Sequence, residues 1–394
     1  MTDFDVGIIG GGIIGLACAA RIASAGRSVV LLERHARPGQ ETSTRNSGVI
    51  HAGLYYPTGS LKATLCVAGR RLLYQRCRAQ GIGHRQTGKL LVATAPEEEA
   101  KLAAIYARAQ QNGAGELRHL ERREITRLEP RVSAISGLWS PESGIVDVHE
   151  LMYSYQKEAA DHDALFVFQT EVEGIDRSAH GFELATRRAT PASVTGGSAV
   201  GSTAGSTGGS EPERATLLCR VVVNAAGLFA DRIAERAGLD IDALRYRYHW
   251  CKGDYFALDP SLRGLVSHLV YPAPVHAGLG IHITFDLGGR MTLGPDTEYV
   301  TELSYRVDAD KRGQFASAAR RYLPELRDEQ LSADYAGIRP KLQGPKDDFR
   351  DFVVEDAAPH GLPGWINLIG IESPGVTASE AIAERVRELC SSYF

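Results

Sequence analysis

The sequence predicts an α/β protein, α+β overall, in which a discontinuous Rossmann-like dinucleotide-binding domain carries an inserted domain built on an antiparallel sheet. Three observations predict this class. A strand, a glycine-rich turn, a helix and a second strand open the chain, short β segments dominate its middle, and a buried strand with a following helix returns near the C-terminal end. The two ends are therefore expected to form one layer, with the middle as a second domain.

The opening segment has the pattern of a βαβ unit. Residues 5–9 and 28–33 are rich in Val, Ile and Leu, as in strands that are buried on both faces. Between them the apolar positions recur at helical spacing, and Gly26 stands where a helix C-cap belongs. Such a unit binds a dinucleotide when its first turn has the right glycines.

Gly10, Gly12 and Gly15 form G-x-G-x-x-G in that turn. The first glycine permits the tight turn, the second lets the backbone approach a pyrophosphate, and the third allows the helix to pack close to the strand. Amide groups and the positive end of the helix then face the phosphates. Glu33 ends the second strand, where an acidic side chain binds ribose hydroxyls, so we expect a dinucleotide site rather than a purely structural turn.

Helical periodicity predicts further helices along the chain. Asp147 and Glu150 have capping-box spacing at the start of one of them. The helices are expected over residues 61–79, 96–113, 148–160, 308–322 and 377–390.

Strands dominate from about residue 165, but residues 187–215 contain Ser, Thr, Gly and Ala with almost no large apolar side chain. We expect that stretch to be a flexible loop between the two strands of a hairpin. Gly288 and Gly289 are expected to turn another hairpin. The predicted dinucleotide-binding domain comprises residues 1–80, 145–235 and 335–394, and the predicted substrate domain comprises residues 81–144 and 236–334.

The composition is typical of soluble globular proteins, with 43% hydrophobic and 23% charged residues in 394. The 44 Lys and Arg residues do not outnumber the 48 Asp and Glu residues, so no nucleic-acid partner is expected. The six scattered cysteines have no C-x-x-C pair and are interpreted as buried thiols of a reducing compartment. A glycine-interrupted leader with Asp3 and Asp5 is unlike a signal peptide, and a cytoplasmic location is expected, with peripheral contact to the inner membrane left open.

A flavin dinucleotide requires contacts to its ring beyond the βαβ unit. Three segments can supply them: residues 41–53, 221–227 and 370–383, all rich in small or polar side chains. Thr377 and Glu380 have capping-box spacing, so the positive end of the last helix would point out of its loop and stabilise a reduced flavin. The alternative interpretation of that helix is a docked C-terminal element.

Several longer motifs give the sequence a family resemblance. They are NSGVIHAGLYYPTGSLKATLC, GIVDVHEL, NAAGLFAD, KGDYF, AGIRPKL and NLIGIESPGVTAS, in this order along the chain. With them the chain resembles the D-amino-acid-oxidase-like superfamily of FAD-dependent oxidoreductases and, within it, the L-2-hydroxyglutarate oxidases and dehydrogenases. The insertion at residues 187–215 departs from the family pattern.

The resemblance implies a FAD-binding domain assembled from separated segments, below an antiparallel sheet that roofs the flavin. It also implies oxidation of a small 2-hydroxy acid, L-2-hydroxyglutarate to 2-oxoglutarate, by hydride transfer to flavin N5. The residues expected to contact FAD are Gly10, Gly12, Gly15, Glu33, Arg34, Thr42, Ser43, Asn46, Ser47, Val172, Ala226, Gly227, Gly370, Ser373, Gly375, Val376 and Thr377.

Oxidation of a secondary alcohol requires a base for the hydroxyl proton. His51 lies in the predicted flavin loop, and an imidazole that titrates near neutrality suits this role. The resemblance adds that glycerol-3-phosphate-oxidising flavoproteins carry a histidine at the matching point. The alternatives are a hydrogen bond or covalent bond to the flavin, and a structural role.

A substrate carboxylate requires a cation, and Arg339 is the expected one. Pro340 favours an extended backbone there, and the resemblance implies that the side chain points over the flavin. A guanidinium binds a carboxylate bidentately. Lys341 is expected on the opposite face of the strand, toward solvent.

Tyr56, Tyr255 and His282 are weaker predictions as hydrogen-bond donors to the substrate, and a core or interface role is the alternative for each. No metal site is expected, because His268, His276 and His282 have irregular spacing and no accompanying carboxylates. The electron acceptor, whether oxygen, a quinone or a protein, stays open. So do two other functions: a FAD-dependent amino-acid, secondary-amine or glycerol-3-phosphate-type enzyme, and a non-catalytic flavoprotein.

Overall fold

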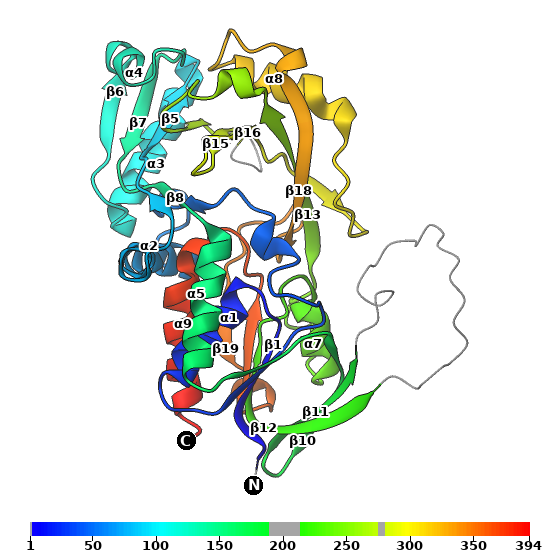
Figure 1. Ribbon diagram of the computed structural model, residues 1–394. Coiled ribbons are helices and arrows are strands. Elements are labelled where there is room, and N and C mark those ends of the chain that lie inside the picture. Colours follow the sequence, from blue (N-terminus) through cyan, green and yellow to red (C-terminus); the bar gives the residue numbers. More distant parts are fainter. Residues whose placement is uncertain (1, 189–212, 275–279) are drawn as a thin grey trace, which may run out of the picture.

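Two large sheets form the framework of the computed structural model, which describes residues 2–188, 213–274 and 280–394 (Figure 1). The first sheet has eight strands in the order β10-β11-β12-β1-β2-β9, with β20 beside β12 and β19 beside β20. Its strands are β1 (Phe4–Ile9), β2 (Val29–Leu32), β9 (Leu165–Val167), β10 (Thr170–Ser178), β11 (Gly181–Arg188), β12 (Arg214–Asn224), β19 (Val353–Asp356) and β20 (Trp365–Ile369). All of them come from the segments predicted to bind the dinucleotide.

The parallel centre of this sheet consists of β1, β2, β9, β12 and β20. Val6 pairs with Val29 on one side and with Val221 on the other, and all three side chains are buried. Such strands need helices on their faces. Three helices pack side by side over one face, as Figure 1 shows: α1 (Ile13–Ala23), α5 (Val148–Asp161) and α9 (Gly375–Ser391).

The second sheet has nine strands in the order β17-β13-β16-β15-β14-β5-β7-β6, with β18 also paired to β13. It is antiparallel except between β14 and β5. Its strands are β5 (Lys89–Ala93), β6 (Arg118–Glu121), β7 (Ser136–Ser140), β13 (His249–Leu258), β14 (Leu269–Pro272), β15 (Ile283–Phe285), β16 (Met291–Leu293), β17 (Glu298–Val300) and β18 (Leu331–Lys341). The domain boundary predicted at residue 335 therefore falls inside β18, whose whole length belongs to this sheet.

Smaller elements connect and cover the two sheets. A separate three-stranded sheet has the strand order β3-β8-β4. Its strands are β3 (Val49–Ile50), β8 (Gly144–Val146) and β4 (His84–Arg85). Among the described residues, the other α-helices are α2 (Leu61–Gln80), α3 (Glu99–Asn112), α4 (Arg122–Leu128), α7 (Ala230–Arg236) and α8 (Arg312–Arg320). None of the helices in the described part of the chain is long and apolar enough to cross a bilayer.

Most local predictions agree with these elements. β11 and β12 pair antiparallel, which confirms the predicted hairpin, whereas its loop lies outside the described residues apart from its ends. β15 and β16 form the second hairpin, and Gly289 has a φ of 79° in its turn. The capping box at α5 is only half present. Asp147 accepts from the Glu150 amide at 3.0 Å, but the Glu150 carboxylate accepts from the Gly83 amide instead. All six cysteines are buried and free.

Candidate active site

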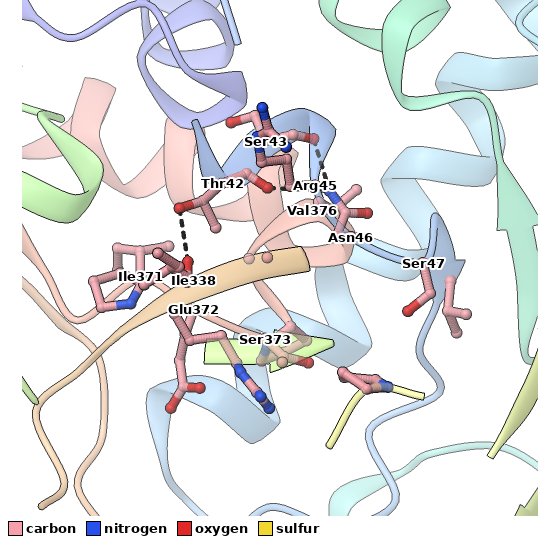
Figure 2. Close-up of a pocket in the computed structure, with 18 of the residues that line it drawn as sticks. Thr42, Ser43, Arg45, Asn46, Ser47, Ile338, Ile371, Glu372, Ser373 and Val376 are labelled. Atoms are coloured by element: carbon pink, nitrogen blue, oxygen red, sulfur yellow. Dashed lines mark hydrogen bonds between the residues drawn. The ribbon is translucent and has the colours of Figure 1, made fainter. Parts of the chain in front are cut away.

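A cavity of about 210 Å³ lies where the carboxyl ends of the parallel strands meet the second sheet. Its walls come from the loop between β2 and β3, from β13 and β18, from the β14–β15 region, and from the start of α9 (Figure 2). A crevice beyond the carboxyl ends of parallel strands is the usual ligand site of such sheets. The cavity is therefore the place to look for the predicted residues.

The glycine-rich turn between β1 and α1 leaves no space for side chains. Gly10 has a φ of 110°, and a Cβ atom there would lie 2.4 Å from the carbonyl oxygen of Ala225. A Cβ atom on Gly15 would lie 2.0 Å from the carbonyl oxygen of Gly10. Gly12 caps α1 without a side-chain hydrogen bond and lines the cavity. The turn thus offers backbone amides to a ligand at close range, as a pyrophosphate requires.

Replacing Gly15 with alanine is expected to weaken FAD binding by at least about 10-fold, because the added methyl group collides with backbone that cannot move aside without opening the turn. Fluorescence titration of the apoprotein with FAD measures this affinity. Gly313→Ala is the control, since its Cβ would come no closer than 3.5 Å to any atom and the residue lies in α8. Equal FAD affinity in both variants would contradict the proposal that the glycine turn binds the pyrophosphate of FAD.

Glu33 directly follows β2 and holds the glycine turn. Its Oε2 atom accepts from the Gly11 amide at 2.6 Å and its Oε1 atom accepts from the His35 amide at 2.7 Å. The side chain is 7% exposed. Its neighbour Arg34 lies 3.8 Å over the Phe229 ring and pairs with Glu41 at 2.6 Å. Both residues lie at the end of β2 and outside the cavity lining.

The predicted flavin loop is held by hydrogen bonds to two other elements, β18 and α1, and by one bond within the loop (Figure 2). Thr42 Oγ1 donates to the Ile338 carbonyl on β18 at 3.0 Å, and Ser43 Oγ accepts from the Ile13 amide at 3.0 Å. Asn46 Nδ2 donates to the Ser43 carbonyl at 2.7 Å. The loop therefore ties the glycine turn to the second sheet, and its small side chains line the cavity.

The N-terminal end of α9 opens into the cavity, but not through the predicted capping box. The helix begins at Gly375, two residues before Thr377. The Thr377 hydroxyl accepts from the His51 amide at 3.0 Å and donates to the Val49 carbonyl at 3.3 Å, while Glu380 pairs with Arg21 at 2.9 Å. The capping-box prediction is wrong because both side chains have tertiary partners. The first turn still faces the cavity with its amides.

His51 lines the cavity and is neutral at physiological pH. Burial lowers the pKa of His51 well below its usual value, and the positive charge of Lys89 and the proximity of His282 lower it further. Its Nε2 atom lies 3.4 Å from Ser373 Oγ. Its Nδ1 atom is buried and has no hydrogen-bond partner among the described residues. An unprotonated imidazole with unused bonding capacity can accept a proton from a bound molecule.

Arg339 also lines the cavity and is fixed by backbone carbonyls. Its Nη2 atom donates to Lys252 at 3.2 Å and to Asp296 at 2.7 Å, and its Nε atom donates to Cys251 at 3.3 Å. These bonds use three of the five N–H groups of the guanidinium. The Nη1 end remains for a ligand, so a carboxylate would bind at that end and not along the Nε–Nη2 edge.

The three weaker predictions differ in position. Tyr255 and His282 line the cavity, whereas Tyr56 lies outside the lining, with its hydroxyl 3.3 Å from Ser373 Oγ. The His282 ring stacks on Tyr271 at 3.8 Å, and its Nδ1 atom donates to the Gly280 carbonyl at 3.1 Å. Burial, assisted by the charge of Lys89, lowers the pKa of His282 to about 3. His282 therefore stays neutral.

The cavity brings most, but not all, of the predicted residues together. Those that line it are Gly12, Thr42, Ser43, Asn46, Ser47, His51, Gly227, Tyr255, His282, Arg339, Ser373, Gly375, Val376 and Thr377. Those outside the lining are Gly10, Gly15, Glu33, Arg34, Tyr56, Val172, Ala226 and Gly370. Val172 packs in an apolar cluster on β10, and its carbonyl accepts from Arg236 at 2.7 Å.

Sequence reasoning missed a buried ionic group beside the cavity. Glu372 lines the cavity, and its Oε1 atom accepts from Lys62 at 2.8 Å and from Lys341 at 3.0 Å. The prediction that Lys341 faces solvent is wrong, because its side chain is only 15% exposed. Lys341 lies two residues after Arg339 on β18, and residues two apart on a strand share a face. Burial alone would raise the pKa of Glu372, but the two lysines outweigh it and lower the pKa to about 2.

Replacing Glu372 with glutamine is expected to lower the free energy of unfolding by about 3–5 kcal/mol, because two buried ammonium groups lose their counter-charge. The folded-state pKa lies below the unfolded value, so this stabilisation is present above about pH 4.5 and is lost as the pH falls through about 2. Urea unfolding measures the difference. Glu325→Gln on the surface is the control, and a loss below about 1 kcal/mol for Glu372→Gln would contradict the prediction.

Three carboxylates elsewhere lie close enough together to bind a cation. In the described part of the chain Asp254, Asp296 and Glu298 form this group. The ammonium of Lys311 lies among them, 3.0 Å from Asp254 and 2.9 Å from Asp296. The lysine already supplies the positive charge that the cluster needs.

The fold, the glycine turn and the cavity define the class of dinucleotide-dependent enzymes. The chain belongs to the family of FAD dependent oxidoreductases, whose family model matches residues 5–389. It is an FAD-dependent oxidoreductase, and FAD is its cofactor. The glycine turn without room for side chains and the open helix end fit this group.

Two relatives and two solved structures illustrate the similarity. The chain is 38% identical to the mitochondrial L-2-hydroxyglutarate dehydrogenase of Arabidopsis thaliana, over 97% of this chain and 82% of that protein. It is 35% identical to the Bos taurus protein of the same name, over 98% and 88%. The fold matches L-alpha-glycerophosphate oxidase from Mycoplasma pneumoniae with FAD bound (TM-score 0.83, 24% identity, 98% and 94% covered) and glycine oxidase from Geobacillus kaustophilus (TM-score 0.79, 22% identity, 100% and 96% covered).

Proposed function

We propose that this enzyme oxidises L-2-hydroxyglutarate to 2-oxoglutarate. The relatives that share 38% and 35% of their residues with it over nearly its whole length are L-2-hydroxyglutarate dehydrogenases. The observation that carries the proposal is that His51, which is neutral, and Arg339, which is fixed, line the same cavity. A 2-hydroxy acid has a hydroxyl and a carboxylate on neighbouring carbons, and these two side chains suit those two groups.

His51 is the proposed proton acceptor. Its lowered pKa keeps the imidazole neutral, and the hydrogen bond that the His51 backbone amide donates to Thr377 Oγ1 holds this residue beside the N-terminal end of α9. Bound FAD would supply the two-electron acceptor for the hydride that leaves C2 of the substrate. Removal of the hydroxyl proton by His51 completes the two-electron oxidation to the 2-oxo acid, so that the proton and the hydride are both accounted for.

Arg339 is the proposed anchor for the carboxylate next to the reacting carbon. Its Nη1 end points away from the three carbonyls that hold the rest of the guanidinium. A charge-assisted hydrogen bond from this end would orient C2 toward the flavin. Tyr255 and His282 line the same cavity and are proposed to bind the substrate through hydrogen bonds.

Anaerobic bleaching of the flavin tests the substrate. The purified holoenzyme is mixed with both enantiomers of 2-hydroxyglutarate, other 2-hydroxy acids, glycerol 3-phosphate and amino acids, and the visible flavin absorbance is followed. We expect rapid bleaching by L-2-hydroxyglutarate. Preferential bleaching by an amino acid or by glycerol 3-phosphate would replace this proposal with one of the related activities, and absence of bleaching by every compound would favour a non-catalytic flavoprotein.

A further inference from the structure

A lysine that has no acidic partner among the described residues lies behind the cavity wall. Lys89 is the first residue of β5, and its side chain is fully buried. Its Nζ atom has no hydrogen-bond partner among the described residues. The ammonium lies 4.0 Å from the ring centroid of Tyr271 and 5.8 Å from that of Tyr55. Among the described residues, the Nζ atom therefore has aromatic rings beside it and no carboxylate as a partner.

Other well-buried lysines of the protein have such partners. Lys62 and Lys341 share Glu372, at 2.8 and 3.0 Å. Lys252 lies 3.0 Å from Asp254. Burying a charge without a counter-charge is costly, and burial lowers the pKa of Lys89 to about 7. Lys89 thus differs from its counterparts in lacking the anion that would stabilise its charged form.

The charge of Lys89 affects the pKa of His282, a residue that lines the cavity. Tyr271, over whose ring the ammonium lies, lines the cavity and stacks on His282 at 3.8 Å with an interplanar angle of 14°. The charges of Lys89 and of Arg339 both lower the pKa of His282. The cavity beside His282 is therefore within the fields of two cations, and burial of the Lys89 side chain limits the screening of its charge by solvent.

We propose that Lys89 is the specificity-determining residue for the second carboxylate of a dicarboxylic substrate. The proposal rests on the proposed function, in which Arg339 binds the carboxylate next to C2. The distal carboxylate then supplies the counter-charge that none of the described residues gives to Lys89. The ammonium acts from behind the Tyr271 ring, so that attraction across the wall, rather than a direct hydrogen bond, favours a dianion over a monoanion that lacks the distal carboxylate.

Binding of unreactive acids to the oxidised holoenzyme tests this role without turnover. Glutarate and butyrate lack the hydroxyl, and their binding is followed through the perturbation of the flavin absorbance spectrum. In Lys89→Met, which keeps the length of the side chain and removes its charge, we expect the Kd of glutarate to rise about 10- to 100-fold. The Kd of butyrate should change less than about 3-fold. Lys157→Met, at an exposed lysine of α5, is the control and should change neither value.

The same comparison extends to catalysis. The ratio of kcat/KM for L-2-hydroxyglutarate to that for L-2-hydroxyvalerate should fall in Lys89→Met by a factor similar to the change in glutarate affinity. Equal weakening of glutarate and butyrate would overturn the proposal, because it would indicate a loss of packing in the wall. Failure of glutarate to bind the wild-type holoenzyme would overturn it as well. Tight glutarate binding with no oxidation of L-2-hydroxyglutarate would support the role of Lys89 and refute the proposed reaction alone.

Discussion

Replacing His51 with alanine is expected to lower kcat by at least about 100-fold, because the hydroxyl proton then has no acceptor in the cavity. The flavin should remain bound, since the His51 amide, which bonds to Thr377, is backbone and is kept in the variant. Stopped-flow measurement of anaerobic flavin reduction by L-2-hydroxyglutarate isolates this step from reoxidation. A decrease below a few-fold, in a variant with full FAD content, would show that His51 is not the base.

The pH dependence of the reductive step gives an independent check on His51. A histidine acts as a base only when it is unprotonated, and its pKa in the folded protein lies well below the usual value. The rate is therefore expected to stay constant from neutral pH down to below about 6.5, the ordinary pKa of histidine, and to fall only at lower pH. An acidic limb centred near the ordinary value would contradict the burial of this imidazole.

Replacing Arg339 with lysine is expected to lower kcat/KM by at least about 100-fold despite the conserved charge. The guanidinium donates to three carbonyls and still presents Nη1 to the cavity. A single ammonium has three donors and cannot meet the same carbonyls and a substrate carboxylate together. Steady-state kinetics with L-2-hydroxyglutarate measures the loss, and the flavin content of the purified variant shows whether cofactor binding is affected.

Arg247→Lys provides the matched control, because Arg247 is 53% exposed and pairs with Asp242 at the surface. It should leave kcat/KM unchanged. An unchanged kcat/KM in Arg339→Lys would show that Arg339 does not bind the substrate. A loss of flavin in parallel with the loss of kcat/KM would show that Arg339 contributes to FAD binding instead.

Features that depend on neighbouring residues in the chain were predictable from the sequence. The glycine turn, the helix over residues 61–79 and the hairpin at Gly288–Gly289 agree closely with the structure. Periodicity and turn residues act over a few positions, and a sequence displays them directly. The predicted role of Thr377 as a helix cap is wrong, because it depended on local spacing alone. The Thr377 hydroxyl accepts a hydrogen bond from the His51 amide, which lies 326 positions away in the chain.

The sequence by itself determined the class of this enzyme: a glycine turn in a βαβ unit, a loop with a histidine, and a strand with an arginine followed by proline. Only the tertiary structure decided which charges meet. Glu372 and Lys62 are 310 positions apart and pair at 2.8 Å, whereas Lys89 has no acidic partner in the described part of the chain. The physical reason is that pairing depends on where strands and loops cross in space, and the energy of a buried charge depends on the partners that this crossing supplies.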